Sequence, residues 1–299
     1  MPQCAAALAE IFVDTLPVGL YADLRVEPET VAALLADARV AAVSLTGSER
    51  AGASVAATAG QFLKPAVLEL GGSDAFVVLA DADVSVAAET AARARLQNTG
   101  QSCIAAKRFI VATEVYDEFL RFFLTHLQAA RGGDPSAPDA SDDFAYGPLA
   151  RLDLAQQLTR QVQASIEAGA QVALTGGQPA PDSAFFHPMV LTDVPPDCPA
   201  WREELFGPVA AVQRANDETH AIRLANDTTF GLGGVVWSKD PARAERVARA
   251  LRCGYVTVNG MTASTPELPF GGRGRSGWGR ELGALGIRAF TVPKTLILG

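Results

Sequence analysis

The stretch VLELGGSDAFVVL at residues 67–79 contains two apolar runs separated by a glycine pair, and this pattern decides the fold class. The runs at 66–70 and 76–79 are short and almost wholly apolar, which is typical of strands buried on both faces of a parallel sheet. On either side of them, apolar runs alternate with helical patterns along most of the chain. The sequence therefore predicts an α/β fold with a largely parallel sheet.

The remaining predicted elements follow the same alternation. Helices are predicted at residues 3–14, 29–37, 49–59, 84–98, 116–130 and 152–168, and further strands at 19–26, 40–45, 107–112, 171–175 and 291–298. Helix–strand pairs are predicted at 217–237 and 241–258. The segments 131–147 and 178–200 are rich in proline and other turn residues, and 271–283 is rich in glycine, so loops are predicted there.

Composition limits the class of function. The 299 residues are 48% hydrophobic and 19% charged, which indicates a folded globular protein. A net charge of -8 argues against nucleic acid or an anionic membrane surface as the partner. The longest apolar runs fall far short of the ~20 residues that span a bilayer. The four cysteines and three histidines have neither metal-ligand nor disulfide-framework spacing, so we expect no metal and a reducing cytoplasm.

The segment Gly100-Gln101-Ser102-Cys103 is the first candidate for chemistry. A cysteine in a turn beside glycine can present its sulfur and its backbone N–H to a substrate. A lone cysteine is more often a buried structural thiol, so this interpretation depends on a partner. Glu69 ends a predicted buried strand, where open α/β sheets place their active sites. Flanking Leu68 and Leu70 suggest restricted water access, which would raise its pKa and favour a base; a solvated strand-end carboxylate is the alternative.

Three further segments could bind a ligand or be ordinary turns. Residues 46–52 join a predicted strand to a helix, and the free N–H groups of a helix start suit a phosphate. The segment EELFGPV at 203–209 is a turn with a charged lead-in. The glycine loop PFGGRGRSG at 269–277 carries arginines that could bind an anion, and a flexible surface loop is the alternative.

Taken in this order, these segments resemble the aldehyde dehydrogenase superfamily. The similarity covers essentially the whole chain, and it is carried by LTGSERAG at 45–52, LELGGS at 68–73, GQSC at 100–103, EELFGPV at 203–209 and PFGGRGRSGWGREL at 269–282. The wording of the first three segments is most similar to the succinate-semialdehyde dehydrogenase branch. The resemblance implies the C-terminal part of a Rossmann-type cofactor domain at 1–69 and a catalytic domain at 70–268. It also implies a return to the cofactor domain and an oligomerisation tail at 269–299.

The resemblance implies NAD(P)-dependent oxidation of an aldehyde in two steps. Cys103 would attack the aldehyde to give a thiohemiacetal, hydride transfer to NAD or NADP would leave a thioester, and Glu69 would activate the hydrolytic water. The thiol pKa would be lowered by nearby dipoles or by the charge of the bound cofactor. Other matching residues would bind the cofactor: Gly47, Ser48, Leu70, Glu204 and Phe206.

The resemblance also implies residues that would contact the substrate. Phe270 would line the substrate tunnel, and Gln97 stands where some succinate-semialdehyde enzymes carry an arginine for the substrate carboxylate. Arg93, Arg95 and Ser264 are nearby alternatives that the sequence does not rank. The tail at 291–298 would add a strand to a neighbouring subunit, which implies a homodimer or homotetramer.

Two alternatives to this function stay open. Members of the family have a further segment before the point that matches Met1, and it carries an asparagine of the oxyanion hole. We therefore expect this chain alone to be weakly active or inactive, since one lost oxyanion donor costs ~10²–10³ in rate. An inactive fragment that serves only in oligomerisation or binding is one alternative. A relative that passes the thioester to coenzyme A is another, and Glu69 argues against it because a positioned base favours water.

Overall fold

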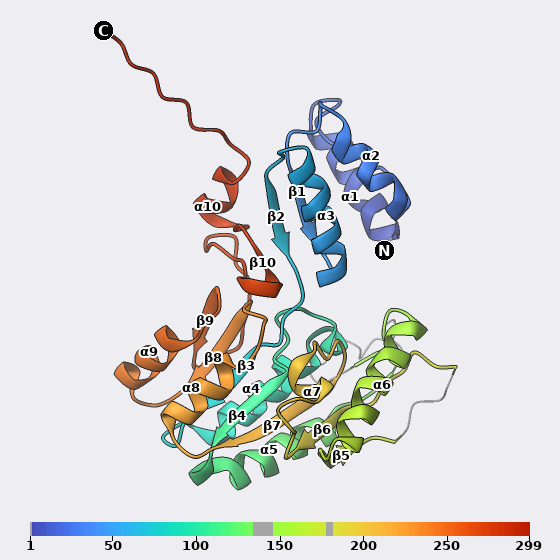
Figure 1. Ribbon diagram of the computed structural model, residues 1–299. Helices are drawn as coiled ribbons and strands as arrows, with labels where there is room; N and C mark the ends of the chain where they lie inside the picture. Colours follow the sequence, from blue (N-terminus) through green and yellow to red (C-terminus); the bar gives the residue numbers. More distant parts are fainter. Residues whose placement is uncertain (1, 134–145, 178–181) are drawn as a thin grey trace. The chain divides into compact units, whose positions relative to one another are not determined.

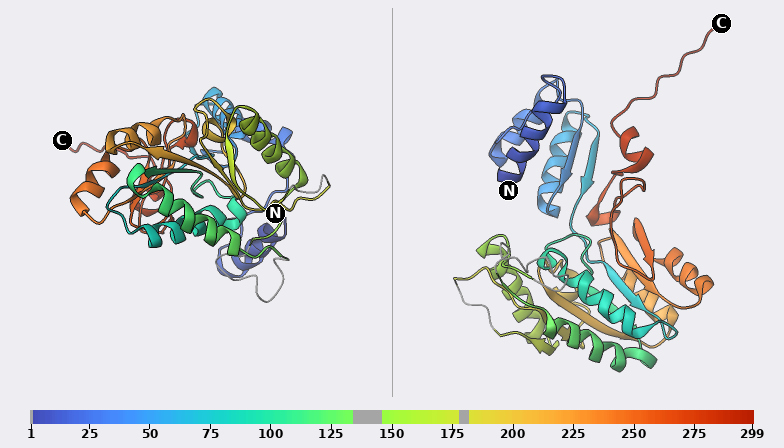
Figure 2. Two further views of the ribbon diagram at one scale, coloured as in Figure 1. Left: turned by 90° about the horizontal axis from the view of Figure 1, so that it is seen from below. Right: turned by 180° about the vertical axis from the view of Figure 1, so that it is seen from behind.

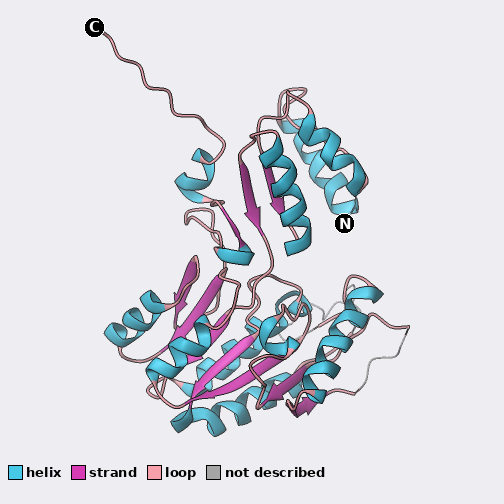
Figure 3. Ribbon diagram, viewed as in Figure 1, coloured by secondary structure: helices cyan, strands magenta, loops and turns pink. Residues whose placement is uncertain are grey.

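The computed structural model describes residues 2–133, 146–177 and 182–299. The chain divides into two compact units: Met1–Val43 with Ser54–Pro65, and Ser44–Ala53 with Ala66–Gly299. Within the described residues, no helix is both long and apolar enough to cross a membrane. Helices and strands alternate along the chain, which confirms the predicted α/β class (Figures 1 and 3).

The smaller unit consists mainly of helices. It contains α1 (Pro2–Thr15), the 3-10 turn Pro28–Thr30, α2 (Val31–Ala36) and the C-terminal part of α3 (Glu49–Gln61). The strand predicted at 19–26 is wrong, because residues 21–27 have no regular structure. The apolar side chains Leu20, Leu24 and Val26 are exposed there, so this segment has no buried face that a strand would need.

The larger unit contains a seven-stranded sheet in the order β5-β6-β7-β4-β3-β8-β9. Six of its strands are parallel, and β5 pairs antiparallel with β6 at one edge. The strands are β3 (Ala75–Val78), β4 (Arg108–Ala112), β5 (Gln171–Thr175), β6 (Met189–Thr192), β7 (Val209–Ala215), β8 (Gly233–Trp237) and β9 (Tyr255–Val258). β3 lies between β4 and β8, with Phe76 opposite both Phe109 and Val235.

Helices cover both faces of this sheet, as Figures 1 and 2 show. Successive residues of a strand point to opposite faces, so Val77 and Val78 belong to different halves of the core. One half packs against α4 (Val84–Leu96) and α5 (Tyr116–Ala129). The other half packs against α6 (Leu152–Glu167), α7 (Pro199–Arg202), α8 (Glu218–Asn226) and α9 (Pro241–Ala250).

A second, three-stranded sheet has the order β1-β2-β10. Its strands are β1 (Val43–Thr46), β2 (Ala66–Glu69) and β10 (Gly277–Trp278), and α10 (Gly283–Arg288) follows. β10 runs antiparallel to β2, with Gly277 opposite Glu69. An added Cβ at Gly277 would lie 2.0 Å from the carbonyl oxygen of Leu68, so only glycine allows this close pairing. The glycine-rich segment thereby comes to lie beside the end of β2.

Several predicted boundaries differ from the structure. The tail at 291–298 has no regular structure, because a strand needs a neighbour and no described residue pairs with it. The strands β6 and β7 and the short helix α7 were not predicted, since their short, alanine- and proline-containing runs give a weak pattern. The predicted loops at 131–147 and 178–200 lie partly outside the described residues. The predicted domain boundaries at 69 and 268 stay a prediction.

Candidate active site

A cleft of about 920 Å³ lies within the larger unit, and segments far apart in the sequence line it. A volume of this size is in the range of small-molecule and cofactor sites, ~300–1,000 Å³. The cleft brings Cys103 and Glu69 together with the turn between β1 and α3. It is also lined by the five residues predicted to bind cofactor: Gly47, Ser48, Leu70, Glu204 and Phe206.

The chain reaches Cys103 through a tight reversal after α4. The helix was predicted to continue to residue 98, but it ends at Leu96 because Asn98 and Thr99 have positive φ angles of 51° and 57°. Gly100 follows with φ 75°, and an added Cβ there would lie 2.4 Å from the carbonyl oxygen of Gly207. The side-chain nitrogens of Asn98 and Gln101 each donate to the other's backbone carbonyl, at 3.0 and 3.2 Å. These bonds hold the loop in one conformation.

Two buried cations bind the carbonyl oxygens of this loop. Arg95, which is fully buried, donates from Nη2 to the carbonyl of Gly100 at 2.9 Å. Lys107, also fully buried, donates from Nζ to the carbonyls of Ser102 at 2.7 Å and of Cys103 at 2.8 Å. The guanidinium of Arg95 is therefore buried and bonded to backbone carbonyl groups, so it is not a candidate to bind a substrate carboxylate. Lys107 also forms an ion pair with Glu204 at 3.2 Å.

Glu69 ends β2 and is 3% exposed, as a residue at the floor of the cleft. Burial raises the pKa of its carboxyl to about 7, and the nearby carboxylate of Glu281 adds to the rise. The backbone amide of Gly272 and the charge of Arg280 oppose it. The raised pKa expected from restricted water access is thus found. Within the described chain, the Oε1 atom of Glu69 is buried and has no hydrogen-bond partner, so it is free to accept from a ligand or water.

The ionisation of Cys103 differs from the expectation of a lowered pKa. Burial raises the pKa of the thiol, and the charges of Asp74, Glu204 and Glu69 raise it further. Lys107 is the group that opposes them. A low-dielectric surrounding with three carboxylates disfavours the thiolate, which is the reactive form. The free chain therefore holds a thiol that is mainly protonated at neutral pH.

The turn between β1 and α3 is held by contacts with the end of β2 and within the start of α3. Gly47 donates its N–H to the carbonyl of Glu69 at 3.0 Å, which ties the turn to the end of β2. The Oγ atom of Ser48 accepts from Ala51 N at 3.2 Å and caps the helix. An added Cβ at Gly52 would lie 2.4 Å from a Leu70 side-chain atom, so this glycine lets α3 pack against Leu70.

Glu204 lies across the cleft from this turn. Its Oε1 atom accepts from Gly72 N at 3.1 Å and pairs with Lys107 Nζ at 3.2 Å. Its Oε2 atom has no hydrogen-bond partner within the described chain, and an added Cβ at Gly71 would lie 2.4 Å from it. One carboxylate oxygen is thus fixed and the other is available, which fits an acceptor for a ribose hydroxyl. Phe206 and Phe230 add apolar surface to the same lining.

The three residues predicted to bind substrate are not among those that line the cleft. Gln97 is half-buried, with an Oε1 atom that has no hydrogen-bond partner in the described chain. Ser264 is exposed. Phe270 is 6% exposed and packs against Tyr255, with ring centroids 5.8 Å apart. The predicted substrate roles of these residues stay predictions.

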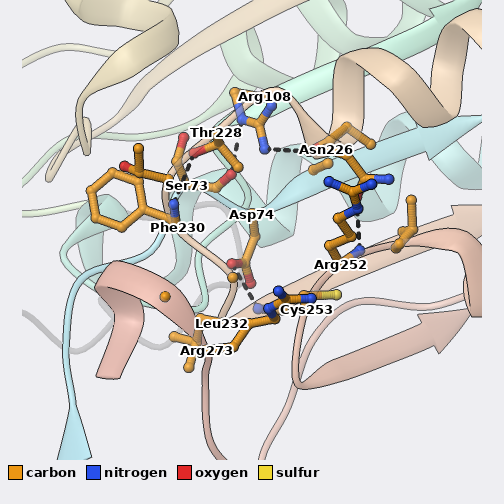
Figure 4. A pocket seen from close by; sticks show the side chains of 18 residues that line it. Ser73, Asp74, Arg108, Asn226, Thr228, Phe230, Leu232, Arg252, Cys253 and Arg273 are labelled. Atoms are coloured by element: carbon orange, nitrogen blue, oxygen red, sulfur yellow. Dashed lines mark hydrogen bonds between the residues drawn. The ribbon is translucent and has the colours of Figure 1, made fainter. Parts of the chain in front are cut away.

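A second, smaller cavity of about 160 Å³ lies behind the start of β3 (Figure 4). Asp74 is buried there, and its Oδ1 atom accepts from Gly233 N at 2.9 Å. Burial raises the pKa of this carboxyl to about 6, although Lys107 lowers it. Arg108 lines the same cavity and donates to the carbonyls of Ser73, Leu224 and Ala225. Among the described residues, no group of three or more His, Cys, Asp or Glu could hold a metal ion.

Sequence reasoning missed these buried charges around the site. Asp74, Arg95, Lys107 and Arg108 are all at most 2% exposed. The signal was available, since ionisable residues inside otherwise apolar runs need partners. The dipeptide Lys107-Arg108 opens a strand that is buried along its whole length, and Asp74 directly precedes another. The sequence could not say which loops these charges serve.

The site thus combines a cysteine and a carboxylate of raised pKa on one cleft of an α/β protein, beside a strand–helix turn. The chain belongs to the aldehyde dehydrogenase family, whose profile matches residues 1–296. The predicted resemblance, and with it the family fold, is confirmed.

Curated relatives and one solved structure that carry the name succinate-semialdehyde dehydrogenase are similar to this chain. The chain is 48% identical to a succinate-semialdehyde dehydrogenase [NADP(+)] of Mycobacterium avium, over 100% of this chain and 63% of the relative. It is 49% identical to the enzyme of that name from Deinococcus radiodurans, over 98% of this chain and 61% of the relative. A crystal structure of the succinic semialdehyde dehydrogenase from Streptococcus pyogenes with NADP+ superposes with a TM-score of 0.92 at 36% identity. It covers 97% of this chain and 63% of that protein. The chain thus spans less than two thirds of the relatives it matches.

Proposed function

We propose that this chain takes part in NAD(P)-dependent oxidation of an aldehyde, with Cys103 as the nucleophile and Glu69 as the base. The observation that carries the proposal is that both side chains line one cleft together with the β1–α3 turn. The family membership supports the reaction class. Glu69 favours water over coenzyme A as the acceptor of the acyl group, because a buried base beside the sulfur would activate water.

The residues divide the oxidation into two steps. The thiolate of Cys103 forms a bond to the aldehyde carbon, and the carbonyl oxygen becomes the alkoxide of a thiohemiacetal. A bound nicotinamide cofactor would supply the hydride acceptor for this oxidation, and the sulfur of Cys103 would then hold the acyl group as a thioester. Glu69 then takes a proton from a water molecule, the water attacks the thioester carbon, and the carbon–sulfur bond breaks to release the acid and the thiolate. A pKa of about 7 suits Glu69 to accept a proton near neutral pH.

The cofactor would be held between the β1–α3 turn and the segment that carries Glu204. Gly47 and Ser48 would contact the pyrophosphate at the start of α3, where helix N–H groups favour an anion. The free oxygen of Glu204 would accept from a ribose hydroxyl, with Leu70 and Phe206 packing near the nicotinamide. The relatives named above support NADP, and NAD is the alternative that the same contacts would accept.

We propose an acid semialdehyde such as succinate semialdehyde as the substrate, because the relatives above carry that name. Gln97, Ser264 and Phe270 remain the proposed substrate contacts. We further propose a homodimer or homotetramer in the cytoplasm. The exposed apolar side chains of Val292, Leu296 and Ile297 support an oligomerisation tail, and the free state of all four cysteines supports a reducing compartment.

Aldehyde protection of Cys103 tests the proposal without requiring turnover. The chain is alkylated with iodoacetamide, and the four cysteine peptides are followed separately by mass spectrometry. Succinate semialdehyde should slow alkylation of Cys103 because the thiohemiacetal occupies its sulfur, while succinate, which cannot form that bond, should not. Cys198 is buried and Cys253 half-buried, so both serve as internal references. Equal alkylation of Cys103 with and without the aldehyde would contradict the proposal.

Reduction of the cofactor is the second measurement. Absorbance of the reduced nicotinamide reports turnover when the aldehyde is added with NADP or NAD, and a Cys103→Ala variant should abolish it. Aldehyde protection without turnover would retain the nucleophile assignment and reject oxidation by this chain alone.

A further inference from the structure

The ammonium group of Lys107 is at the centre of the contacts behind the nucleophile. A lysine has three N–H donors; two of them donate here to the carbonyls of Ser102 and Cys103, and the Oε1 atom of Glu204 lies 3.2 Å from Nζ as an ion-pair partner. The side chain is 0% exposed, so water does not screen these contacts. Burial lowers the pKa of Lys107, and Glu204 and Asp74 counteract that effect. The cation is therefore maintained by its anionic neighbours.

The same lysine joins two segments that both line the cleft. Glu204 Oε1 also accepts from Gly72 N at 3.1 Å, so its position is fixed by both the lysine and the backbone. The backbone at Gly72 packs closely on the nucleophile loop, since an added Cβ there would lie 2.7 Å from the carbonyl oxygen of Cys103. A change in the charge of Glu204 therefore affects Cys103 through one intervening group, the ammonium of Lys107.

We propose that Lys107 is a positioning residue that holds the Cys103 loop through its carbonyls and stabilises the sulfur anion, with Glu204 as its counter-charge. This inference rests on the proposed function, because it assigns Glu204 two roles: binding the ribose and limiting the reactivity of the thiol. A simple structural tether would need only the hydrogen bonds of Lys107. The proposal requires its charge as well.

Lys107 and Glu204 have opposite effects on the pKa of Cys103. The charge of Lys107 favours the thiolate, whereas Glu204, Asp74 and Glu69 disfavour it. Removal of the lysine charge should raise the pKa of Cys103, and removal of the Glu204 charge should lower it. A change that merely loosened the loop would not move the pKa in opposite directions in the two variants. The sign pattern thus separates an electrostatic role from a tether.

The test measures the pH dependence of Cys103 alkylation in the full chain without cofactor or aldehyde. Mass spectrometry of the cysteine peptides gives the midpoint for Cys103 alone. Nearby charges shift a pKa by about one unit or more, which is about tenfold in thiolate at neutral pH. We expect Glu204→Gln to lower the midpoint by about that amount and Lys107→Met to raise it, while Lys107→Arg restores part of it.

Glu203→Gln is the matched control. Glu203 adjoins Glu204 in sequence, but its Oε2 atom accepts from Gln161 Nε2 at 2.7 Å and it is not among the charges that act on Cys103. Its variant should leave the midpoint unchanged. Shifts in the same direction for Lys107→Met and Glu204→Gln would overturn the proposal. If Lys107→Met does not fold, as judged by circular dichroism, equal midpoints for Glu204→Gln and Glu203→Gln would overturn it.

This outcome is separate from that of the proposed function. No aldehyde, hydride transfer or cofactor enters the measurement, so a chain that fails the protection assay can still give the opposite shifts. If aldehyde protects Cys103 but Glu204→Gln does not shift the pH midpoint of its alkylation, the assignment of Cys103 as nucleophile stands and the proposed role of Lys107 is rejected.

Discussion

Replacement of Gly100 by alanine is expected to damage the nucleophile loop more than any surface glycine replacement. Gly100 has φ 75°, and a left-handed conformation costs an L-residue about 1–2 kcal/mol. The added Cβ would also lie 2.4 Å from the oxygen and 2.5 Å from the carbon of the Gly207 carbonyl, and 2.8 Å from Arg95 Nη2. Two of these atoms are backbone, and the carbonyl of Gly207 is held by Val209 N at 2.7 Å, so they cannot move aside cheaply.

The overlap adds an overpacking cost of ~1–3 kcal/mol, so the total destabilisation is ~2–5 kcal/mol. Gly177→Ala is the matched control, because Gly177 has φ 104° with no atom within 4 Å of an added Cβ. It should cost only the conformational part, ~1–2 kcal/mol. Urea unfolding followed by tryptophan fluorescence gives both free energies, and Trp201 is a suitable reporter because it is buried. Equal costs for the two variants would refute the claim that the Gly207 backbone determines the residue at position 100.

Three further expectations concern the base, the core and the surface. Because the pKa of Glu69 is raised to about 7, its carboxyl is protonated and inactive as a base at acid pH. Deacylation of Cys103 after treatment with an activated ester should therefore rise with pH around a midpoint near 7, and Glu69→Gln should abolish this rise. Phe123→Ala should destabilise the larger unit by ~3–5 kcal/mol in urea unfolding, because Phe123 is 0% exposed and packs on Phe119 and Phe109. Arg249→Ala should leave the urea midpoint unchanged, since its ion pair with Glu245 is exposed on both sides; a clear loss would contradict that estimate of exposed pairs.

The fold was predictable where one residue pattern determined one element. The runs at 66–70 and 76–79 became β2 and β3. For β3 the reason is that a buried parallel strand needs almost continuous apolar side chains, whereas β2 pairs antiparallel with β10 in the smaller sheet. The tail at 291–298 also contains apolar residues, yet strand pairing needs two segments, and no described segment pairs with the tail. β7, in contrast, is present in the structure but was not predicted. Its alanines have little strand preference, and the segment forms a strand because it pairs with β4 and β6.

The proximity of Cys103 and Glu69 to the predicted cofactor residues could be inferred from the sequence, but the ionisation of the thiol could not. Cys103 and Glu69 were inferred from the turns around them, and both line one cleft. The sequence could not give the thiol pKa, because it depends on Asp74, Glu204 and Lys107, which lie close only after folding. Glu204 was predicted as a cofactor ligand, and its contact with a buried lysine had no signal in the residues next to either.

The buried cations also explain why a nucleophile can be placed at this position. A loop that leaves its sulfur facing a cleft cannot pair its backbone in a sheet, and buried carbonyl groups without donors cost free energy. In this chain, Arg95 satisfies the carbonyl of Gly100, and Lys107 satisfies those of Ser102 and Cys103. Burying two cations is itself unfavourable unless anions lie close, and Glu204 and Asp74 act on both. The acids that keep the loop's cations charged are therefore the same groups that add to the effect of burial in raising the pKa of the free thiol. Rigidity of the nucleophile and restraint of its reactivity thus depend on the same buried charges.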